Sequence, residues 1–465
     1  MPRARRAHLH GDRCPRRLPR PPAVRAALIL ALAMVVPALA KADVSGTRLV
    51  TLKNGARVLL APDPRAAALS VGVWIETGAR YERPGIVGLS HMVEHLSARG
   101  VDPAGDPGVR RRIGALGGST TSSATDDFTC FVHTVPPGSL ETVLELEAGR
   151  FAAAPSQAML DQDRARLREE NRARARANPL ERPVQVLYAT AFTSHPYRLA
   201  ITGDNDDLGR ITLKDCQDFL RARYTPDHTL ITLVGAFDPD QALQLVRRHL
   251  ESIGKRSDSR AAAAPREPEP TAERRGSAAG NAPVPILVVG WRAPASAGDD
   301  GAALDLVSVL LTGGPTSRLT RRLVVGEQTS LFAHAACDRQ RDATMFWAAV
   351  VVKQGADSAA VERSVVAEVE RLASEPVPGE ELDRARKQLE VALLSGRQTA
   401  TDRGQLMGAA QMIVGDWRDA DRQFELLRKL TPADLQQAAA RTFVPARRTV
   451  VWMRAADAKG MGAGR

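Results

Sequence analysis

The sequence predicts a chain of the α+β class, built of two similar α/β domains, and three observations support this. The chain has 465 residues, which is about the length of two ordinary domains. Residues 211–235 align without gaps with residues 430–454, as "ITLKDCQDFLRARYTPDHTLITLVG" and "LTPADLQQAAARTFVPARRTVVWMR". Residues 254–282, between the two segments, are rich in alanine, proline, arginine and glutamate and lack apolar periodicity, as linkers do.

Each aligned segment predicts a capped helix, a proline turn and a strand. Thr212 and Asp215 match Thr431 and Asp434 as a threonine followed three residues later by an acid. A common helix–turn–strand unit could mimic part of this match, but the shared spacing favours a duplicated domain. Upstream, we expect strands and helices in the following ranges: two strands in 47–64, a strand in 68–78, a helix through 88–100, a strand in 127–135, and helices in 138–150 and 156–176.

Most of the positive charge lies in the first 42 residues. These residues hold nine Lys/Arg and one acid, so they carry +8 of the formal net charge of +11. The positive charge of the chain is therefore no longer an argument for a nucleic-acid partner. A basic stretch, a short apolar run and small residues at "ALAKAD" follow one another, as in a secretory signal peptide. We therefore expect a signal peptide at 1–42. No later segment reaches the length of a membrane span, so we expect no stable membrane span after the signal is cleaved.

This organisation gives four expected segments, and the leader sets their compartment. They are a signal peptide at 1–42, an N-terminal domain at 43–253, a linker at 254–282 and a C-terminal domain at 283–465. A signal of this Gram-negative type predicts a periplasmic or secreted protein, while an uncleaved N-terminal anchor is the alternative.

The stretch "HMVEH" is the strongest chemical signal in the chain. On a helix, His91 and His95 lie one turn apart on one face, with Glu94 beside them. Two neutral imidazoles suit Zn²⁺, and Glu94 could take a proton from a water that the metal activates. This is the H-x-x-E-H order of the inverzincins. By itself the motif could also be two surface histidines beside a solvated glutamate.

A third ligand is expected from a neighbouring element. The helix expected over 156–176 offers Asp163 and Glu170, which are seven residues apart and therefore share one face. Glu169 is the adjacent candidate, rotated by about 100° around the helix. The spacing alone leaves open which of the two glutamates binds metal, and a solvated, charged helix face is the alternative.

These motifs, in this order, resemble the pitrilysin/insulinase family of metallopeptidases, especially its two-domain bacterial members similar to mitochondrial processing peptidase. "GLSHMVEHL" looks like the family's zinc helix, "GGSTTSSATDDFTCF" like its Gly-Gly segment and following strand, and "DRARLREE" like the helix of the third ligand. The resemblance covers residues 45–455. It implies two similar α/β domains, each an antiparallel sheet with helices packed on one face.

The resemblance also implies roles for individual residues. One Zn²⁺ per chain would be bound by His91, His95 and Glu170, with Glu94 as the general base. Asp163 would take the place of an assisting acid that is usually glutamate in the family. The Gly-Gly segment would bind substrate backbone through Gly118, Ser119 and Thr121, although Thr121 and Ser122 stand where the family often has Asn and Ala.

The second domain departs from the pattern of active members. Many of these members carry an Arg and a Tyr that hold substrate, and Val324 and Leu331 fall at those positions here. We therefore expect a homodimer, or a heterodimer with a related zinc-less subunit that carries the Arg/Tyr pair. The function implied is an exported zinc endopeptidase acting on peptides or unfolded segments. The alternatives are a non-catalytic assembly or scaffold subunit and a peptide-binding subunit of the same fold.

Overall fold

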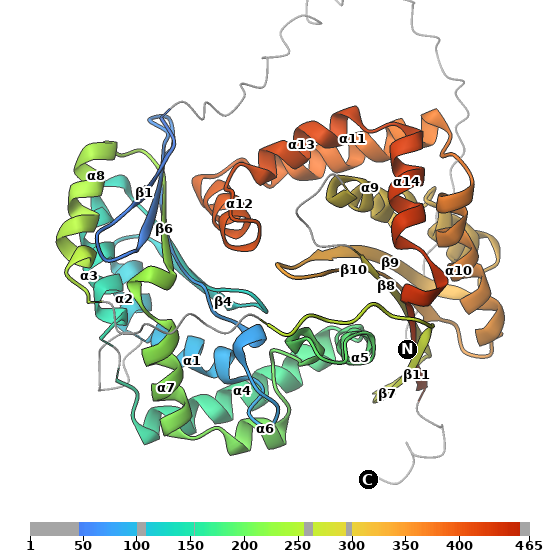
Figure 1. Ribbon diagram of the computed structural model, residues 1–465, viewed down its shortest axis with the longest axis horizontal. Coiled ribbons are helices and arrows are strands. Elements are labelled where there is room, and N and C mark those ends of the chain that lie inside the picture. The colour runs from blue at the N-terminus through green and yellow to red at the C-terminus, as the bar shows by residue number, and fades with distance from the viewer. Residues whose placement is uncertain (1–45, 100–107, 153, 255–263, 294–299, 456–465) are drawn as a thin grey trace, which may run out of the picture. The chain divides into compact units, whose positions relative to one another are not determined.

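Two β-sheets organise the chain (Figure 1). The computed structural model describes residues 46–99, 108–152, 154–254, 264–293 and 300–455. The strands are β1 (Arg48–Thr51), β2 (Arg57–Pro62), β3 (Leu69–Ile75), β4 (Ser119–Ala124), β5 (Thr129–Val135), β6 (Thr229–Gly235), β7 (Arg274–Ala282), β8 (Ile286–Ala293), β9 (Ser330–Arg339), β10 (Thr344–Val352) and β11 (Arg448–Ala455).

Helices fill the segments between the strands. The α-helices are α1 (Leu89–Ala98), α2 (Gly108–Ala115), α3 (Leu140–Arg150), α4 (Gln157–Ala177), α5 (Glu181–Ala191), α6 (Asn205–Arg210), α7 (Leu213–Arg223), α8 (Pro239–Val246), α9 (Asp300–Thr312), α10 (Ser358–Ser374), α11 (Gly379–Ser395), α12 (Ala400–Ile413), α13 (Asp419–Lys429) and α14 (Pro432–Thr442). Short 3₁₀ or π segments are η1 (Ala79–Tyr81), η2 (Pro137–Ser139), η3 (Pro196–Arg198), η4 (Pro226–His228), η5 (Arg247–Glu251), η6 (Thr320–Gly326) and η7 (Pro445–Arg447).

The two sheets share a topology. The first has the order β1-β2-β6-β3-β5-β4 and the second the order β7-β11-β8-β10-β9. The strands β6 and β11 hold equivalent places, and each follows a helix capped by the predicted threonine–aspartate box. The two aligned sequence segments therefore form the same unit at the same position in the two sheets, which confirms the helix–turn–strand prediction.

Two α/β domains are confirmed, but each sheet is mixed. The strand β6 runs parallel to β2, and β11 runs parallel to β7, while the other neighbouring strands are antiparallel. The expectation of a wholly antiparallel sheet was wrong at these two pairs. Each final strand is reached through a helix, and such a crossover lets a strand run parallel to an earlier one.

Each sheet packs the helices of its own domain on one face, as expected, and a helix from the other half of the chain covers the opposite face. A large core joins the first sheet to α1, α3 and α7, and a second core joins the other sheet to α9, α10 and α14. On the opposite faces, α12 packs on the first sheet through Met412, and α5 packs on the second through Leu187. The strands β3 and β6 are buried along their whole length, because near-continuous apolar strands need cover on both faces.

The contact of α12 with the first sheet depends on a glycine. A Cβ atom built on Gly408 would lie 2.2 Å from the ring of Trp74, closer than any side chain allows. Trp74 is 2% exposed, and its indole N–H donates to the Thr232 hydroxyl at 3.0 Å. Gly408 therefore lets a helix from the C-terminal half approach the N-terminal sheet.

Two sequence-based segments need comment. The strand β7 lies inside the stretch expected as linker, where it pairs with β11 through the backbone. The expected signal peptide at 1–42 lies outside the described residues, as do residues 255–263 of the linker. The domain limits 43–253 and 283–465 stay predictions. Within the described part of the chain, every helix is too short or too polar to cross a membrane.

Candidate metal centre

The helix α1 carries "HMVEH", and a buried carboxylate holds its N-terminal end. The first N–H groups of a helix have no partner inside the helix. The two carboxylate oxygens of Glu82 accept hydrogen bonds from the backbone N–H groups of Gly88, at 2.7 Å, and Ser90, at 2.6 Å. Gly88 has φ +91°, a left-handed conformation that glycine adopts without strain. Glu82 therefore fixes the start of the helix that presents His91 and His95.

The Glu82 carboxyl is expected to change stability with pH. Burial raises its pKa from 4.5 to about 7, although both N–H groups favour the charged form. The unfolded chain therefore loses this proton at lower pH than the folded chain, and the group's contribution to stability falls as pH rises from about 4.5 to 7. Glu82→Gln loses one of the two hydrogen bonds, at a cost of about 1–3 kcal/mol. Urea unfolding at pH 5 and pH 8 should show a smaller deficit of the variant at pH 8, and an equal deficit at both values contradicts this account.

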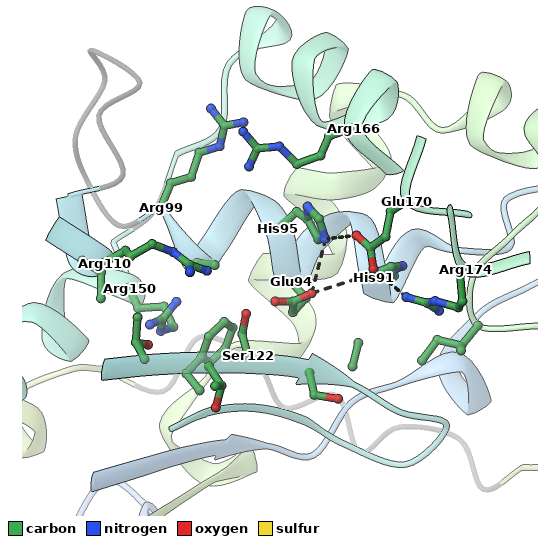
Figure 2. Close-up of a pocket in the computed structure, with 18 residues that line it drawn as sticks. His91, Glu94, His95, Arg99, Arg110, Ser122, Arg150, Arg166, Glu170 and Arg174 are labelled. Atoms are coloured by element: carbon green, nitrogen blue, oxygen red, sulfur yellow. Dashed lines mark hydrogen bonds and ion pairs between the residues drawn. The ribbon is translucent and has the colours of Figure 1, made fainter. Parts of the chain in front are cut away.

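Three side chains, two from α1 and one from α4, point toward one another (Figure 2). One ligand atom each of His91, His95 and Glu170 lies within 4.8 Å of the others. The Nε2 atom of His91 is 3.7 Å from one carboxylate oxygen of Glu170, and that of His95 is 3.4 Å from the other. The helices α1 and α4 thus bring together residues that are 75 positions apart in the chain.

This group fits a tetrahedral zinc ion. Zinc binds imidazole nitrogen and carboxylate oxygen at about 2.0–2.2 Å, which places neighbouring ligand atoms about 3.3 Å apart. The observed separations of 3.4 and 3.7 Å, which run to the two different carboxylate oxygens of Glu170, are near that value, and one ligand atom from each residue lies within 4.8 Å of the others. They are longer than hydrogen bonds, so the three groups lie around a common point without bonding to one another. Two imidazoles and one carboxylate also leave the fourth position for water.

The electrostatic environment of α1 favours neutral imidazole. Burial, together with the charge of the nearby His95, lowers the pKa of His91 from 6.5 to about 4. A neutral imidazole is the form that binds a metal. Glu94 is 4% exposed, and its Oε2 atom lies 3.9 Å from the Nε2 of His91 and 3.8 Å from that of His95. Burial raises the pKa of Glu94, and a hydrogen bond from Ser122 lowers it in part.

The other acids of α4 point elsewhere. Glu169 lies on the exposed face, where its carboxylate pairs with Arg172 at 2.8 Å. Asp163 is fully buried, and its carboxylate binds the guanidinium of Arg99. The structure therefore brings Glu170 to the two histidines and keeps Glu169 away. Asp163 contacts neither histidine through any hydrogen bond or ion pair found among the described residues.

The strand β4 forms one wall of the site. It is the edge of the first sheet, and its residues Thr120, Thr121, Ser122, Ser123 and Ala124 line the cavity that holds the three ligands. Gly118 and Ser119 lie just before this stretch and are not among the lining residues. Of the expected substrate-binding residues, Thr121 is therefore the one that faces the cavity. An open edge strand offers unpaired N–H and C=O groups to an extended peptide.

Sequence reasoning missed several residues that shape this site. Glu82 and Ser122 bond to α1, and Arg110 and Arg166 line the cavity. None of the four had a local signal, since Glu82 lies seven residues before Leu89, the first residue of α1, and the other three come together only through the fold. In the second domain, Val324 is half-buried in η6 and Leu331 is 52% exposed on β9.

An HxxEH helix, a carboxylate from a second helix and a buried glutamate beside them define the centre of a metal-dependent hydrolase. Comparison with known proteins identifies its family. Residues 57–205 match the model described as insulinase (peptidase family M16), and residues 210–389 match the model described as the peptidase M16 inactive domain. The chain belongs to this family, and its ligand set makes it a metallopeptidase. The resemblance inferred from the motifs is confirmed.

Individual relatives match over different lengths. A protein named zinc protease PqqE from Helicobacter pylori is 26% identical over 416 residues, covering 87% of this chain and 92% of the relative. The crystal structure of a protease from Helicobacter pylori superposes with a TM-score of 0.83 at 24% identity, covering 88% of this chain and 99% of that one. Cytochrome b-c1 complex subunit 1 from Mus musculus is 26% identical over 217 residues, which is 46% of this chain and 44% of the relative.

Proposed function

We propose that this chain is an exported zinc-dependent endopeptidase that cleaves peptides or unfolded polypeptide segments. The convergence of His91, His95 and Glu170, with Glu94 within 3.9 Å of both imidazoles, carries the proposal. The relative named as a zinc protease, which matches over nearly its whole length, supports the choice of metal. The basic and apolar leader at 1–42 supports export.

The chain's own residues would bind the substrate and move the proton. When bound, zinc supplies a Lewis acid that polarises the scissile carbonyl and lowers the pKa of water. Glu94 accepts a proton from the attacking water as the C–O bond forms, and returns it to the amine nitrogen as the C–N bond breaks. The substrate backbone adds to the open edge of β4, opposite α1. Ser122, hydrogen-bonded to Glu94, holds the base toward the cavity.

Replacing the third ligand tests the metal site. Glu170→Gln should lower zinc affinity by more than about 100-fold, since loss of an outer-shell partner alone costs 10- to 100-fold. Glu169→Gln is the matched control, because its carboxylate is 60% exposed and pairs with Arg172. Zinc content after dialysis against a weak chelator measures both. Zinc retained by Glu170→Gln and lost by Glu169→Gln would reverse the assignment.

A partner subunit is part of the proposal. Val324 and Leu331 stand where an Arg/Tyr pair was expected, so this chain would need a homologous zinc-less subunit for full activity. The purified chain should therefore hold zinc and cleave a quenched peptide slowly, with an increase when the partner is added. High turnover by the chain alone contradicts the need for a partner.

A non-catalytic assembly subunit is the second candidate. The half-length match to a cytochrome b-c1 subunit and the missing Arg/Tyr pair favour it. The complete ligand set and the buried Glu94 favour the peptidase. Stoichiometric zinc together with peptide cleavage excludes the assembly role as the sole function.

A further inference from the structure

The cavity around the metal ligands is unusually rich in arginine. Its volume is about 610 Å³, and Figure 2 shows basic side chains around the three ligands. The lining acids, Glu94 and Glu170, are both assigned to the proton transfer and the metal. The lining arginines are Arg99, Arg110, Arg150, Arg166 and Arg174. A bound metal ion would add further positive charge. Apart from Glu94 and Glu170, the described lining of the cavity offers no carboxylate to balance these cations.

Three of these arginines already have partners. Arg150 is 1% exposed, and its Nε atom donates to the buried carboxylate of Glu147 at 2.7 Å. Arg99 binds the buried carboxylate of Asp163. Arg174 lies 2.5 Å from Glu170, on the opposite side of the ligands from Arg99 and Arg110 (Figure 2). These guanidinium groups are therefore at least partly neutralised by the protein itself.

Two arginines lack such a partner. The nearest carboxylate to Arg166 is that of Asp163, 3.9 Å away and already bound by Arg99, and the Arg166 side chain is 65% exposed. Arg110 lies on α2 and is exposed, with no ion pair or hydrogen bond to any residue that the structure describes. Both reach the catalytic cavity, and Figure 2 shows them on the side of His95 away from Arg174.

We propose that Arg110 and Arg166 bind a substrate carboxylate close to the scissile bond, so that this peptidase prefers acidic peptides. The inference rests on the proposed function and adds a substrate class to it. A guanidinium binds a carboxylate through two parallel hydrogen bonds, a geometry that lysine does not reproduce. A strand added to β4 rises by about 3.3 Å per residue, so a side chain two or three residues from the scissile bond lies about 7–10 Å along the cavity.

The orientation of β4 gives the expected side. In Figure 2, Arg110 lies on the side of the cavity where the strand that carries Ser122 begins, so it is placed toward the N-terminal end of β4. A peptide that pairs antiparallel to β4 has its C-terminal part at that end. We therefore expect the acidic group on the C-terminal side of the cleaved bond. An internal Asp or Glu and the free C-terminal carboxylate share this chemistry.

Peptide binding tests the preference without turnover. The zinc-loaded Glu94→Gln protein would be titrated with fluorescent peptides that carry Asp, Asn or Lys at each position of one peptide sequence in turn. Fluorescence anisotropy should show the Asp peptide binding about tenfold more tightly than its Asn counterpart, a difference typical of hydrogen bonds to charged groups. The ratio should fall with added salt, because partly exposed charges are screened. Free and amidated C-termini distinguish the two sources of carboxylate.

Arginine variants identify the residues responsible. Arg110→Gln and Arg166→Gln, singly and together, should reduce the Asp-to-Asn ratio toward one. Arg112→Gln is the matched control, because Arg112 lies on the same helix, is exposed and does not line the cavity. Equal binding of Asp and Asn peptides, or a preference that survives the double variant, overturns the inference.

The result is separable from the proposed function. Cleavage by the wild-type protein without acidic preference would retain the peptidase and reject the role of Arg110 and Arg166. Acidic peptides bound through these arginines, without cleavage even with a partner subunit, would retain the binding site and reject the peptidase.

Discussion

Glu94→Gln should lower peptide cleavage by about 10²- to 10⁴-fold, the usual contribution of a general acid–base group. The glutamine has nearly the same shape but cannot accept the proton of the attacking water. Glu94 is 4% exposed and lies beside both imidazoles, so no other carboxylate among the described residues is placed to substitute for it. Glu170 is the nearest alternative, and it is assigned to the metal.

The measurement pairs activity with metal content. Glu94→Gln should keep one zinc per chain and an unchanged melting temperature, while cleavage of a quenched peptide library is lost. His91→Ala, in contrast, should lose both zinc and cleavage, because it removes a ligand. Near wild-type cleavage by Glu94→Gln would falsify the assignment of Glu94 as the base.

The metal helix was predictable because its signal is local. Residues His91, Glu94 and His95 share a face by spacing alone, and the structure places them so. The proposed third ligand needed tertiary contacts for its choice, since Glu169 and Glu170 differ only by a rotation of about 100° on one helix. The packing of α4 against α1 selects Glu170 and leaves Glu169 in solvent.

The parts that the sequence did not reveal are held by long-range backbone pairing. The strand β7 has the sequence "RRGSAAGNA", whose small and polar residues give no alternating apolar pattern. It is a strand because the distant strand β11, whose Thr449 pairs with Arg274, supplies backbone partners along one edge of the sheet. The parallel pairs have the same origin, because register between distant strands leaves no trace in local periodicity.

The arginine-rich cavity also had no local signal. Arg166 and Arg174 lie in a helix whose alternating charges read as a solvated face, and Arg110 lies in the run "RRR". Their role emerges only when α2, α4 and β4 surround one cavity. A charge pattern can indicate exposure, but it cannot tell open solvent from the wall of a site.

Glu147→Gln should destabilise the fold by about 3–5 kcal/mol, the usual cost of breaking a buried ion pair. Glu147 is fully buried and binds both Arg150, with Nε–Oε2 at 2.7 Å, and the Nε2 of His133, at 2.8 Å. Arg150 in turn donates to the carbonyl oxygen of Ser97, in the last turn of α1, and lies over the ring of Phe131 at 3.5 Å. Removing the carboxylate charge leaves a buried guanidinium uncompensated beside the metal helix.

The pH dependence gives a second readout of Glu147. Burial raises the pKa of this carboxyl, but the charges of Arg150 and His133 outweigh burial and lower it from 4.5 to about 2. A depressed pKa contributes stability that is complete above about pH 4.5 and is lost as pH falls toward 2. The difference between wild type and Glu147→Gln should therefore be full at pH 7 and shrink below pH 4.5.

Denaturant unfolding of matched variants tests the network. Glu145→Gln on the same helix is the control, because Glu145 is exposed and its replacement should change stability by less than about 0.5 kcal/mol. Because Arg150 also holds the end of α1, Glu147→Gln should weaken zinc retention while leaving all three ligands in place. A variant as stable as Glu145→Gln, with full zinc retention, would show that the metal helix does not depend on this buried ion pair.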